Sequence, residues 1–213
     1  MLLCTLMVAQ GARAGPFEQG MESLERGDFA EAYCLWRPLA MRGHAEAAYH
    51  VGWLYANGNG LKVDIDQAIY WWTKAADQGH TDAQFALGFA YTQGEGIKED
   101  PDKALSWFVR AADAGHADAR DIILAKVLSG SPEVQRWLPD LLKKDWFGRP
   151  IRVKVDRANL RTGPGTSFDQ AGLVVKDTQL KMIGKKNDWY QVIDAEGGIG
   201  ISWIAGWLTE PAE

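Results

Sequence analysis

A repeat with a period of 36 residues is the feature of this sequence that most restricts its fold. A Gly-His pair occurs at residues 43–44, 79–80 and 115–116, and most positions between these pairs match one period apart. Alanine and a bulky aromatic residue recur at this period, at Ala32, Ala68 and Ala104 and at Trp36, Trp72 and Phe108. Such self-similarity is typical of helical solenoids, whose units bury their apolar faces against their neighbours. These arrays mostly serve as binding scaffolds, so the sequence predicts a protein that holds a partner.

The segment from Phe17 to Trp146 predicts eight helices in four pairs. Helix starts are indicated by side chains that accept hydrogen bonds from the amides of a first turn, namely Asp28, Asp64, Thr81 and Asp100. Glycine-rich segments at 57–60 and 93–96 supply the positive-φ residues that a tight turn between helices requires. Three tryptophans recur at packing positions and are therefore predicted to lie in the core, namely Trp36, Trp72 and Trp107.

These residues resemble the Sel-1-like repeat, a relative of the tetratricopeptide repeat. Residues 48–80 and 87–116 carry its pattern of spaced alanines, Gly-x-x-Tyr, two loop glycines, Asp, an aromatic pair and Gly-His. A degenerate helix pair precedes them, and residues 117–129 begin a further unit. The resemblance implies an α-α superhelix that mediates protein assembly, in a family with many exported bacterial members. One branch, the cysteine-rich Helicobacter proteins, has been linked with penicillin binding, but this chain lacks the cysteines of that branch.

The composition changes after Pro150. Short apolar runs separated by turn residues predict a small all-β domain, at 151–155, 180–183, 189–193 and 199–204. The segment from Ala158 to Ser167, followed by Asp-Trp-Tyr and Ser-Trp-Ile segments, resembles the bacterial Src-homology-3 family, whose β-barrels are associated with cell-wall peptide or protein ligands. Leu160 is expected to point into the barrel.

Residues 1–14 have the features of a secretory signal peptide. Leu2 to Ala9 form an apolar run too short to span a bilayer, and Ala12-Arg13-Ala14 fits a cleavage site. We therefore expect a periplasmic or secreted protein without an integral membrane segment after cleavage. A frayed cytoplasmic N-terminus is the alternative, because no Lys or Arg precedes the run. If cleavage follows Ala14, Cys34 is the only remaining cysteine and no disulfide can form within the chain.

The predicted organisation therefore has four parts. They are a signal peptide at 1–14, the repeat solenoid at 15–130, a capping helix and linker at 131–150, and the bacterial Src-homology-3 domain at 151–213.

The net charge of −5 argues against nucleic acid as a partner. The first 149 residues contain 15 Lys and Arg against 20 Asp and Glu, and the remaining residues contain 8 of each. Binding nucleic acid requires a basic stripe that replaces condensed counterions, and the sequence has no such run. The predicted partner is a protein or peptide, with peptidoglycan as the other ligand class.

The histidines do not predict a metal site. His44, His80 and His116 recur in equivalent loops about 10 Å or more apart, whereas nitrogens that share a zinc ion lie about 2.1 Å from it. Each is expected to be a loop residue with a satisfied ring nitrogen, and His50, outside the repeat pattern, is expected to face solvent. No Cys/His, Ser/His/Asp or paired-carboxylate spacing of a known catalytic kind occurs, so we predict no catalytic residues, metal or cofactor.

Two sets of aromatic residues are the candidate ligand-binding residues. The core stripe of the first helix in a pair runs through positions 48, 51, 52 and 55, which leaves Tyr49 and Trp53 about 100–140° from its centre and partly exposed. Phe85 and Phe89 take the same positions one period later. First helices line the concave wall in this class of superhelix, so these four rings can grip a peptide; packing between repeats is the alternative.

In the β domain, the candidate platform is defined by analogy with aromatic grooves that bind extended peptides. Its residues are Phe168, Trp189, Trp203 and Trp207. Trp203 is expected to anchor the core instead, and both roles stay open for Trp189. The sequence thus predicts a non-catalytic exported adaptor of the bacterial cell envelope. The alternatives are a peptidoglycan-recognition module and, third, a β-lactamase-like enzyme of the cysteine-rich repeat branch.

Overall fold

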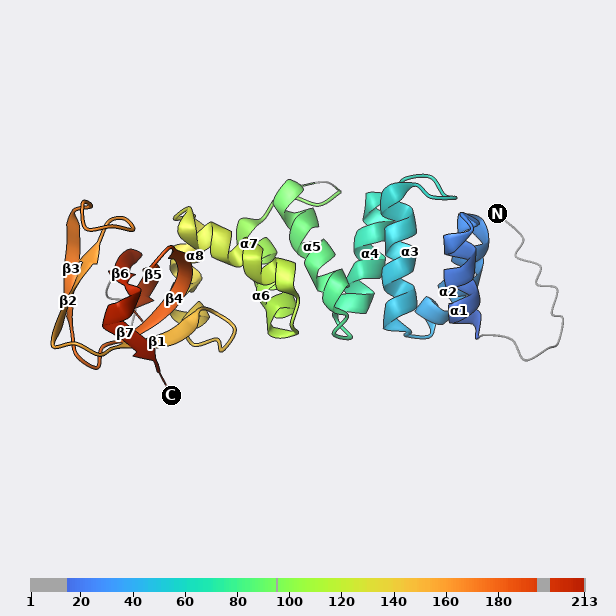
Figure 1. The fold of residues 1–213 in the computed structure, drawn as a ribbon. Coiled ribbons are helices and arrows are strands. Elements are labelled where there is room, and N and C mark those ends of the chain that lie inside the picture. The colour runs from blue at the N-terminus through green and yellow to red at the C-terminus, as the bar shows by residue number, and fades with distance from the viewer. Residues whose placement is uncertain (1–14, 95, 195–199, 213) are drawn as a thin grey trace. The chain divides into compact units, whose positions relative to one another are not determined.

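The structure, a computed structural model, describes residues 15–94, 96–194 and 200–212 (Figure 1). It divides into two compact units, one ending at His116 and the other beginning at Ala117. The described part of the first unit contains six helices, α1 (Pro16–Glu25), α2 (Phe29–Met41), α3 (Ala45–Asn57), α4 (Ile65–Ala76), α5 (Thr81–Gln93) and α6 (Pro101–Asp113). Each of these helices contacts the next one along the chain, as expected of a solenoid.

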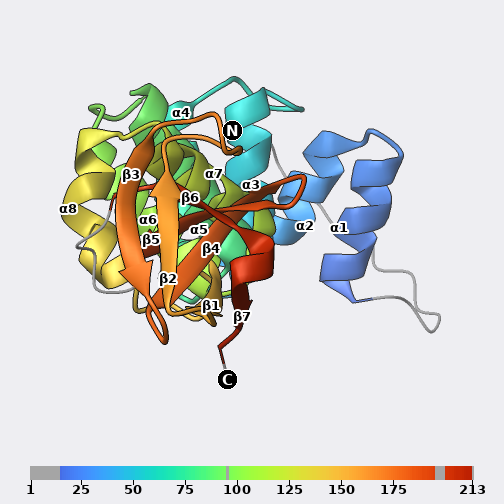
Figure 2. The ribbon, with the colours of Figure 1, turned by 60° about the vertical axis from the view of Figure 1, so that its left-hand side comes forward.

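The described part of the second unit contains two α-helices followed by an antiparallel sheet. The helices are α7 (Ala117–Leu128) and α8 (Pro132–Leu141). The strands are β1 (Arg149–Val153), β2 (Arg157–Arg161), β3 (Gln170–Val175), β4 (Gln179–Lys186), β5 (Trp189–Asp194), β6 (Ser202–Ala205) and β7 (Thr209–Pro211). They lie in the order β3-β2-β6-β5-β4-β1-β7, and Figure 2 shows β2 and β3 side by side. The predicted fold class, eight helices of an α-α superhelix and then a small β domain, is confirmed.

Helices α7 and α8 belong to the same compact unit as the sheet. The Lys181 ammonium group on β4 donates a hydrogen bond to the Lys144 carbonyl after α8, at 2.8 Å. Burial of this ammonium group lowers the pKa of Lys181. The predicted domain boundaries, after residue 130 and after residue 150, stay predictions. The capping role of residues 131–150 also stays a prediction. The predicted signal peptide at 1–14 lies outside the described residues.

Side-chain caps fix four of the helix starts in the first unit. The Asp64 and Asp100 carboxylates accept hydrogen bonds from the Gln67 and Lys103 amides, both at 3.0 Å, as predicted. The prediction for Thr81 was wrong, because the Nδ1 atom of His80 accepts from the Ala83 amide at 3.2 Å. His44 caps α3 in the same way through the Ala47 amide.

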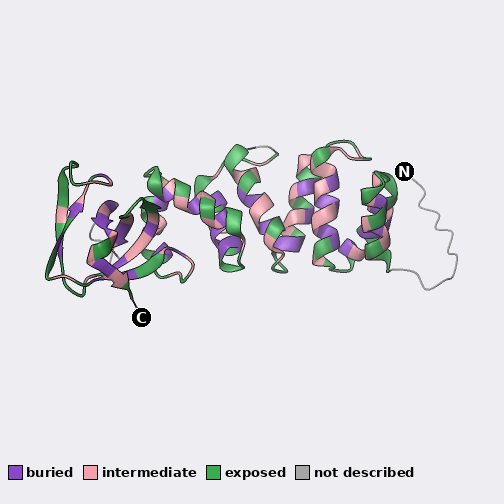
Figure 3. Ribbon diagram, viewed as in Figure 1, coloured by how far each residue is buried: buried purple, intermediate pink, exposed green. Residues whose placement is uncertain are grey.

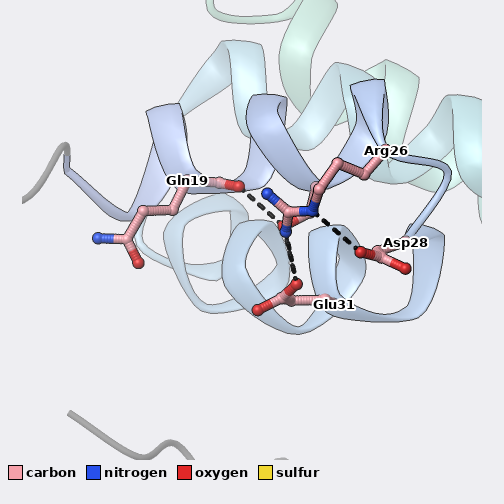
Figure 4. A network of polar contacts seen from close by, with 5 residues as sticks. Gln19, Arg26, Asp28 and Glu31 are labelled. Atoms are coloured by element: carbon pink, nitrogen blue, oxygen red, sulfur yellow. Dashed lines mark hydrogen bonds and ion pairs between the residues drawn. The ribbon is translucent and has the colours of Figure 1, made fainter. Parts of the chain in front are cut away.

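The prediction that Asp28 caps a helix was also wrong. Asp28 precedes α2, but its side chain accepts no hydrogen bond from the first turn of that helix. Its carboxylate is instead held by the Arg26 guanidinium group, at 3.1 Å. The same guanidinium group contacts Glu31 at 3.0 Å, and this network closes the short turn between α1 and α2 (Figure 4).

Glycines on the first helix of each pair bring the two helix axes close together. A Cβ atom on Gly52 would lie 2.6 Å from the Trp72 ring, and one on Gly88 would lie 2.6 Å from the Phe108 ring. Both distances are far shorter than van der Waals contact, so the aromatic ring of the second helix occupies the space that a side chain would need. Figure 3 shows buried residues along all six helices, with exposed residues beside them.

The pair α1 and α2 is a further copy of the repeat. Gly20 faces the Trp36 ring just as Gly52 faces Trp72. The connection from α1 to α2 spans residues 26–28, whereas that from α3 to α4 spans residues 58–64. Four residues are therefore missing from the first connection, and the helices match once this deletion is allowed for. The deletion hides α1 from a search at a fixed period of 36.

The predicted core positions are confirmed for Trp36, which is fully buried. Trp72 and Trp107 are half-buried and pack against the same core cluster. Cys34 on α2 is half-buried and carries no free thiol in the structure of the full chain. The expectation of a lone cysteine concerns a chain cleaved after Ala14, so it stays a prediction.

The core of the sheet contains Leu160, which is fully buried as predicted. Trp203 does not anchor this core, contrary to expectation, because it is half-buried while its neighbours Ser202 and Ile204 are buried. Adjacent residues of a strand point to opposite faces, so an inward Ile204 directs Trp203 outward. Ser202 tolerates burial because its hydroxyl group donates to the Gly200 carbonyl at 3.2 Å.

Candidate binding surfaces

Stacked aromatic and histidine rings join consecutive helix pairs. Tyr49 on α3 stacks on His80, with ring centroids 4.7 Å apart, and Phe85 on α5 stacks on His116 at 4.1 Å. Phe17 on α1 stacks on His44 at 5.0 Å, so the contact recurs in all three repeats of the first unit. The alternative prediction for the aromatic candidates, that they pack between repeats, therefore describes Tyr49 and Phe85.

Carboxylates complete the contacts of these histidines. A Glu46 oxygen lies 3.5 Å from Nε2 of His80, and an Asp82 oxygen lies 3.5 Å from Nε2 of His116. Because Nδ1 of His80 accepts an amide hydrogen bond, the neutral ring carries its proton on Nε2, which faces the carboxylate. The expectation that His44 and His80 are loop residues with a satisfied ring nitrogen is confirmed.

His50 is not exposed to solvent, so that prediction was wrong. Its ring stacks on Trp36, with centroids 4.6 Å apart, and its side chain is only 16% exposed. The sequence gives no sign of this contact, because position 50 is not repeated and Trp36 belongs to the preceding helix pair. Burial lowers the pKa of His50, although the Glu46 carboxylate, 3.8 Å from Nε2, acts in the opposite direction.

The lowered pKa of His50 predicts a loss of stability in acid. Below a pH of about 6.5 the unfolded chain takes up a proton at this ring more readily than the folded chain. The free energy of unfolding of the first unit should therefore fall between pH 7 and pH 5, by less than about 1.4 kcal/mol per pH unit from this group. Urea unfolding at both pH values measures the loss, and the variant His50→Gln should lose less. An equal loss in both proteins would contradict the prediction.

The four aromatic candidates of the first unit, Tyr49, Trp53, Phe85 and Phe89, are called the first-helix aromatics below. Phe89 is 39% exposed and the other three are half-buried, so the expected partial exposure is confirmed. Phe85 and Phe89 form one cluster, with ring centroids 5.0 Å apart and each 5.7 Å from the Phe108 ring. Tyr49 and Trp53 pack against the core on α3. Their use in binding stays a prediction.

In the second unit, the structure brings together two of the four candidates. The rings of Trp189 and Trp207 meet edge to face, with centroids 5.9 Å apart, and Trp207 is 57% exposed. Phe168 is 44% exposed and covers Gly163, while Trp203 is half-buried on β6. Among the described residues, no ring contact joins Phe168 or Trp203 to the tryptophan pair. The exposed rings of this unit are therefore divided between two places.

A groove between the second helices α2 and α4 did not figure in the sequence analysis. It has a volume of about 350 Å³ and is lined by Arg37, Met41, Gln67, Tyr70, Trp71 and Lys74. The Lys74 ammonium group lies 5.0 Å from the centre of the Tyr70 ring and 5.9 Å from that of Trp71. The sequence signal was the Tyr70-Trp71 pair three residues before Lys74, which places a cation above aromatic rings on one helix face.

The stacked helix pairs and the antiparallel sheet define a helical repeat array and a small β domain. The Sel1 repeat family matches residues 45–80 and 81–116, and the bacterial SH3 domain family matches residues 156–210. The chain therefore contains two Sel1 repeats and a bacterial SH3 domain. These domain types are associated with protein–protein interaction or cell-wall binding, and Sel1-repeat relatives are mostly non-catalytic.

Two solved structures are similar to about half of this chain. A Sel1 repeat protein from Oxalobacter formigenes is 28% identical, with a TM-score of 0.52, over 57% of this chain and 52% of that protein. A protective antigen present in uropathogenic Escherichia coli strains is 25% identical, with a TM-score of 0.52, over 57% of this chain and 28% of the antigen. The match thus spans about half of the first protein and about a quarter of the second. No curated protein is detectably similar to the chain.

Among the described residues, no helix has both the length and the apolar character needed to span a bilayer.

Proposed function

We propose that the protein is a non-catalytic, exported adaptor that holds a protein or peptide partner in the bacterial cell envelope. The observation that supports this most is the combination, in one chain, of two domain types that are associated with binding. The apolar run at residues 2–9 and the small residues that follow it support export. Intact mass of the protein from an envelope fraction tests export, and a cytoplasmic chain that retains residues 1–14 would refute it.

The first-helix aromatics are the proposed contact surface of the repeats. Phe89 is partly exposed on α5, and Trp53 takes the equivalent position on α3. Aromatic residues at partly exposed positions bury a large area when a partner covers them, so they often dominate the binding energy. The two rings lie one repeat apart, which suits a partner segment that runs across both helices.

Capture and stability of the same variants test this surface. Phe89→Ala and Trp53→Ala should each weaken capture of a partner from envelope extract by about fivefold or more. The melting temperature of Phe89→Ala should change little, because an exposed ring contributes little to folding. Binding is measured with immobilised protein and melting by circular dichroism at 222 nm.

The control variant is Val63→Ala, which removes an exposed apolar side chain from the connection between α3 and α4. It should leave capture unchanged. Large destabilisation of the aromatic variants, with normal capture by the fraction that remains folded, would show that these rings belong to the core. The proposed contact surface would then be wrong.

Peptidoglycan recognition is the second candidate function, and the exposed Trp189–Trp207 pair favours it. Exposed tryptophans on a small β domain supply flat apolar surfaces of the kind that grip extended ligands. Sedimentation with purified sacculi distinguishes the two functions. Retention in the pellet that is lost in Trp207→Ala supports peptidoglycan binding, whereas a protein that stays in the supernatant supports the adaptor function.

A further inference from the structure

The groove between α2 and α4 has an unusual charge for the unit that contains it. Residues 1–116 contain 9 Lys and Arg against 15 Asp and Glu, yet Arg37 and Lys74 both line this groove. Both side chains are exposed, and neither forms an ion pair with a described carboxylate. The two cations therefore offer their charge to a ligand.

Three other cations of the first unit already have partners. The Arg26 guanidinium group contacts Asp28 and Glu31 at 3.1 and 3.0 Å, and the Lys103 ammonium group lies 3.6 Å from Asp100. The equivalent of Lys74 one period later is Arg110, whose guanidinium group donates to the Ala76 carbonyl at 3.4 Å. Among the described residues, no carbonyl accepts a hydrogen bond from the Lys74 ammonium group. This ammonium group is therefore available to a ligand, whereas the Arg110 guanidinium group is not.

The groove also offers apolar surface. Met41 and Tyr70 are among the exposed large apolar side chains of the chain, and both line it. Cations beside exposed apolar side chains fit a ligand that carries both negative charge and apolar groups.

We propose that this groove binds an extended acidic peptide segment in which carboxylate and apolar side chains alternate. The carboxylates face Arg37 and Lys74, and the apolar side chains cover Met41 and Tyr70. Each helix supplies one cation and one exposed apolar side chain four residues apart, Arg37 with Met41 on α2 and Lys74 with Tyr70 on α4, so both walls can receive a carboxylate and an apolar group of such a peptide. The groove lies on second helices, apart from the first-helix aromatics, so its test is independent of theirs.

The test uses a dye-labelled peptide of alternating glutamate and leucine, and a second peptide of equal length with glutamine in place of glutamate. Fluorescence polarisation with the full chain measures the affinity for each at low and at moderate salt. The acidic peptide should bind at least about tenfold more tightly than the neutral one, and salt should weaken its binding. Arg37→Gln and Lys74→Gln should each weaken it by about fivefold.

The matched control is Lys98→Gln, which removes the same charge from the exposed connection between α5 and α6. It should leave the affinity unchanged. Equal binding of both peptides, or an equal loss in Lys98→Gln, would overturn the proposal, because binding would then not depend on this groove. Equally tight binding of a single-stranded oligonucleotide of the same charge would also overturn it. Circular dichroism of each variant shows whether it is folded, and Tyr70→Phe, which keeps the ring, should retain binding.

Discussion

Replacing Trp36 with alanine should lower the free energy of unfolding of the first unit by about 3–5 kcal/mol. The side chain is fully buried, its ring stacks on His50, and its indole nitrogen donates to the Phe17 carbonyl at 3.1 Å. Alanine would leave a cavity next to Gly20 and remove the hydrogen bond that joins α2 to α1. Urea unfolding followed by circular dichroism measures the loss.

The control for this prediction comes from the next repeats. Position 108 has phenylalanine where position 36 has tryptophan, and Phe108 is equally buried against its own glycine, Gly88. Trp36→Phe should therefore lose clearly less stability than Trp36→Ala. If Trp36→Ala unfolds at the same urea concentration as the unchanged protein, then α1 and α2 are not a packed repeat.

Replacing Leu160 with alanine should destabilise the second unit by about 2–5 kcal/mol and leave the first unit unchanged. Leu160 is fully buried on β2 and packs within the core of the sheet. Phe168→Ala is the matched control, since the Phe168 ring is 44% exposed and should contribute little. Amide signals of residues in each unit, followed by nuclear magnetic resonance during heating, report the two units separately. Parallel loss of both signals in Leu160→Ala would contradict independent unfolding.

The sequence predicts the parts of the fold that repeat. Asp64 and Asp100 are 36 residues apart and both cap a helix, because the same local geometry recurs around them. The glycines that contact Trp72 and Phe108, Gly52 and Gly88, are also one period apart and have the same packing role. Where the period breaks, the prediction is less exact: the sequence predicts the first helix pair only as a degenerate copy, since four residues are missing between α1 and α2.

Contacts between different helix pairs are the other source of error. His50 has no equivalent in the next repeat, so its position against Trp36 depends on how the first two pairs pack. The groove at Arg37 and Lys74 joins residues from two helices that are far apart in the chain. The expectation that Trp203 anchors the core was wrong for a different reason. In a strand that contains more than one large apolar residue, the sequence does not show which of them faces inward.

The ring stack between Tyr49 and His80 has a consequence for how such a protein changes over evolutionary time. The Tyr49 ring, the capping His80 and the Glu46 carboxylate all lie within one matched repeat, residues 45–80. Each copy therefore brings the complete contact that receives the next helix pair. Duplication of one period within the gene would lengthen the array by a copy whose two ends already fit their neighbours, without new compensating substitutions. The length of the array is therefore free to vary while its joints stay constant.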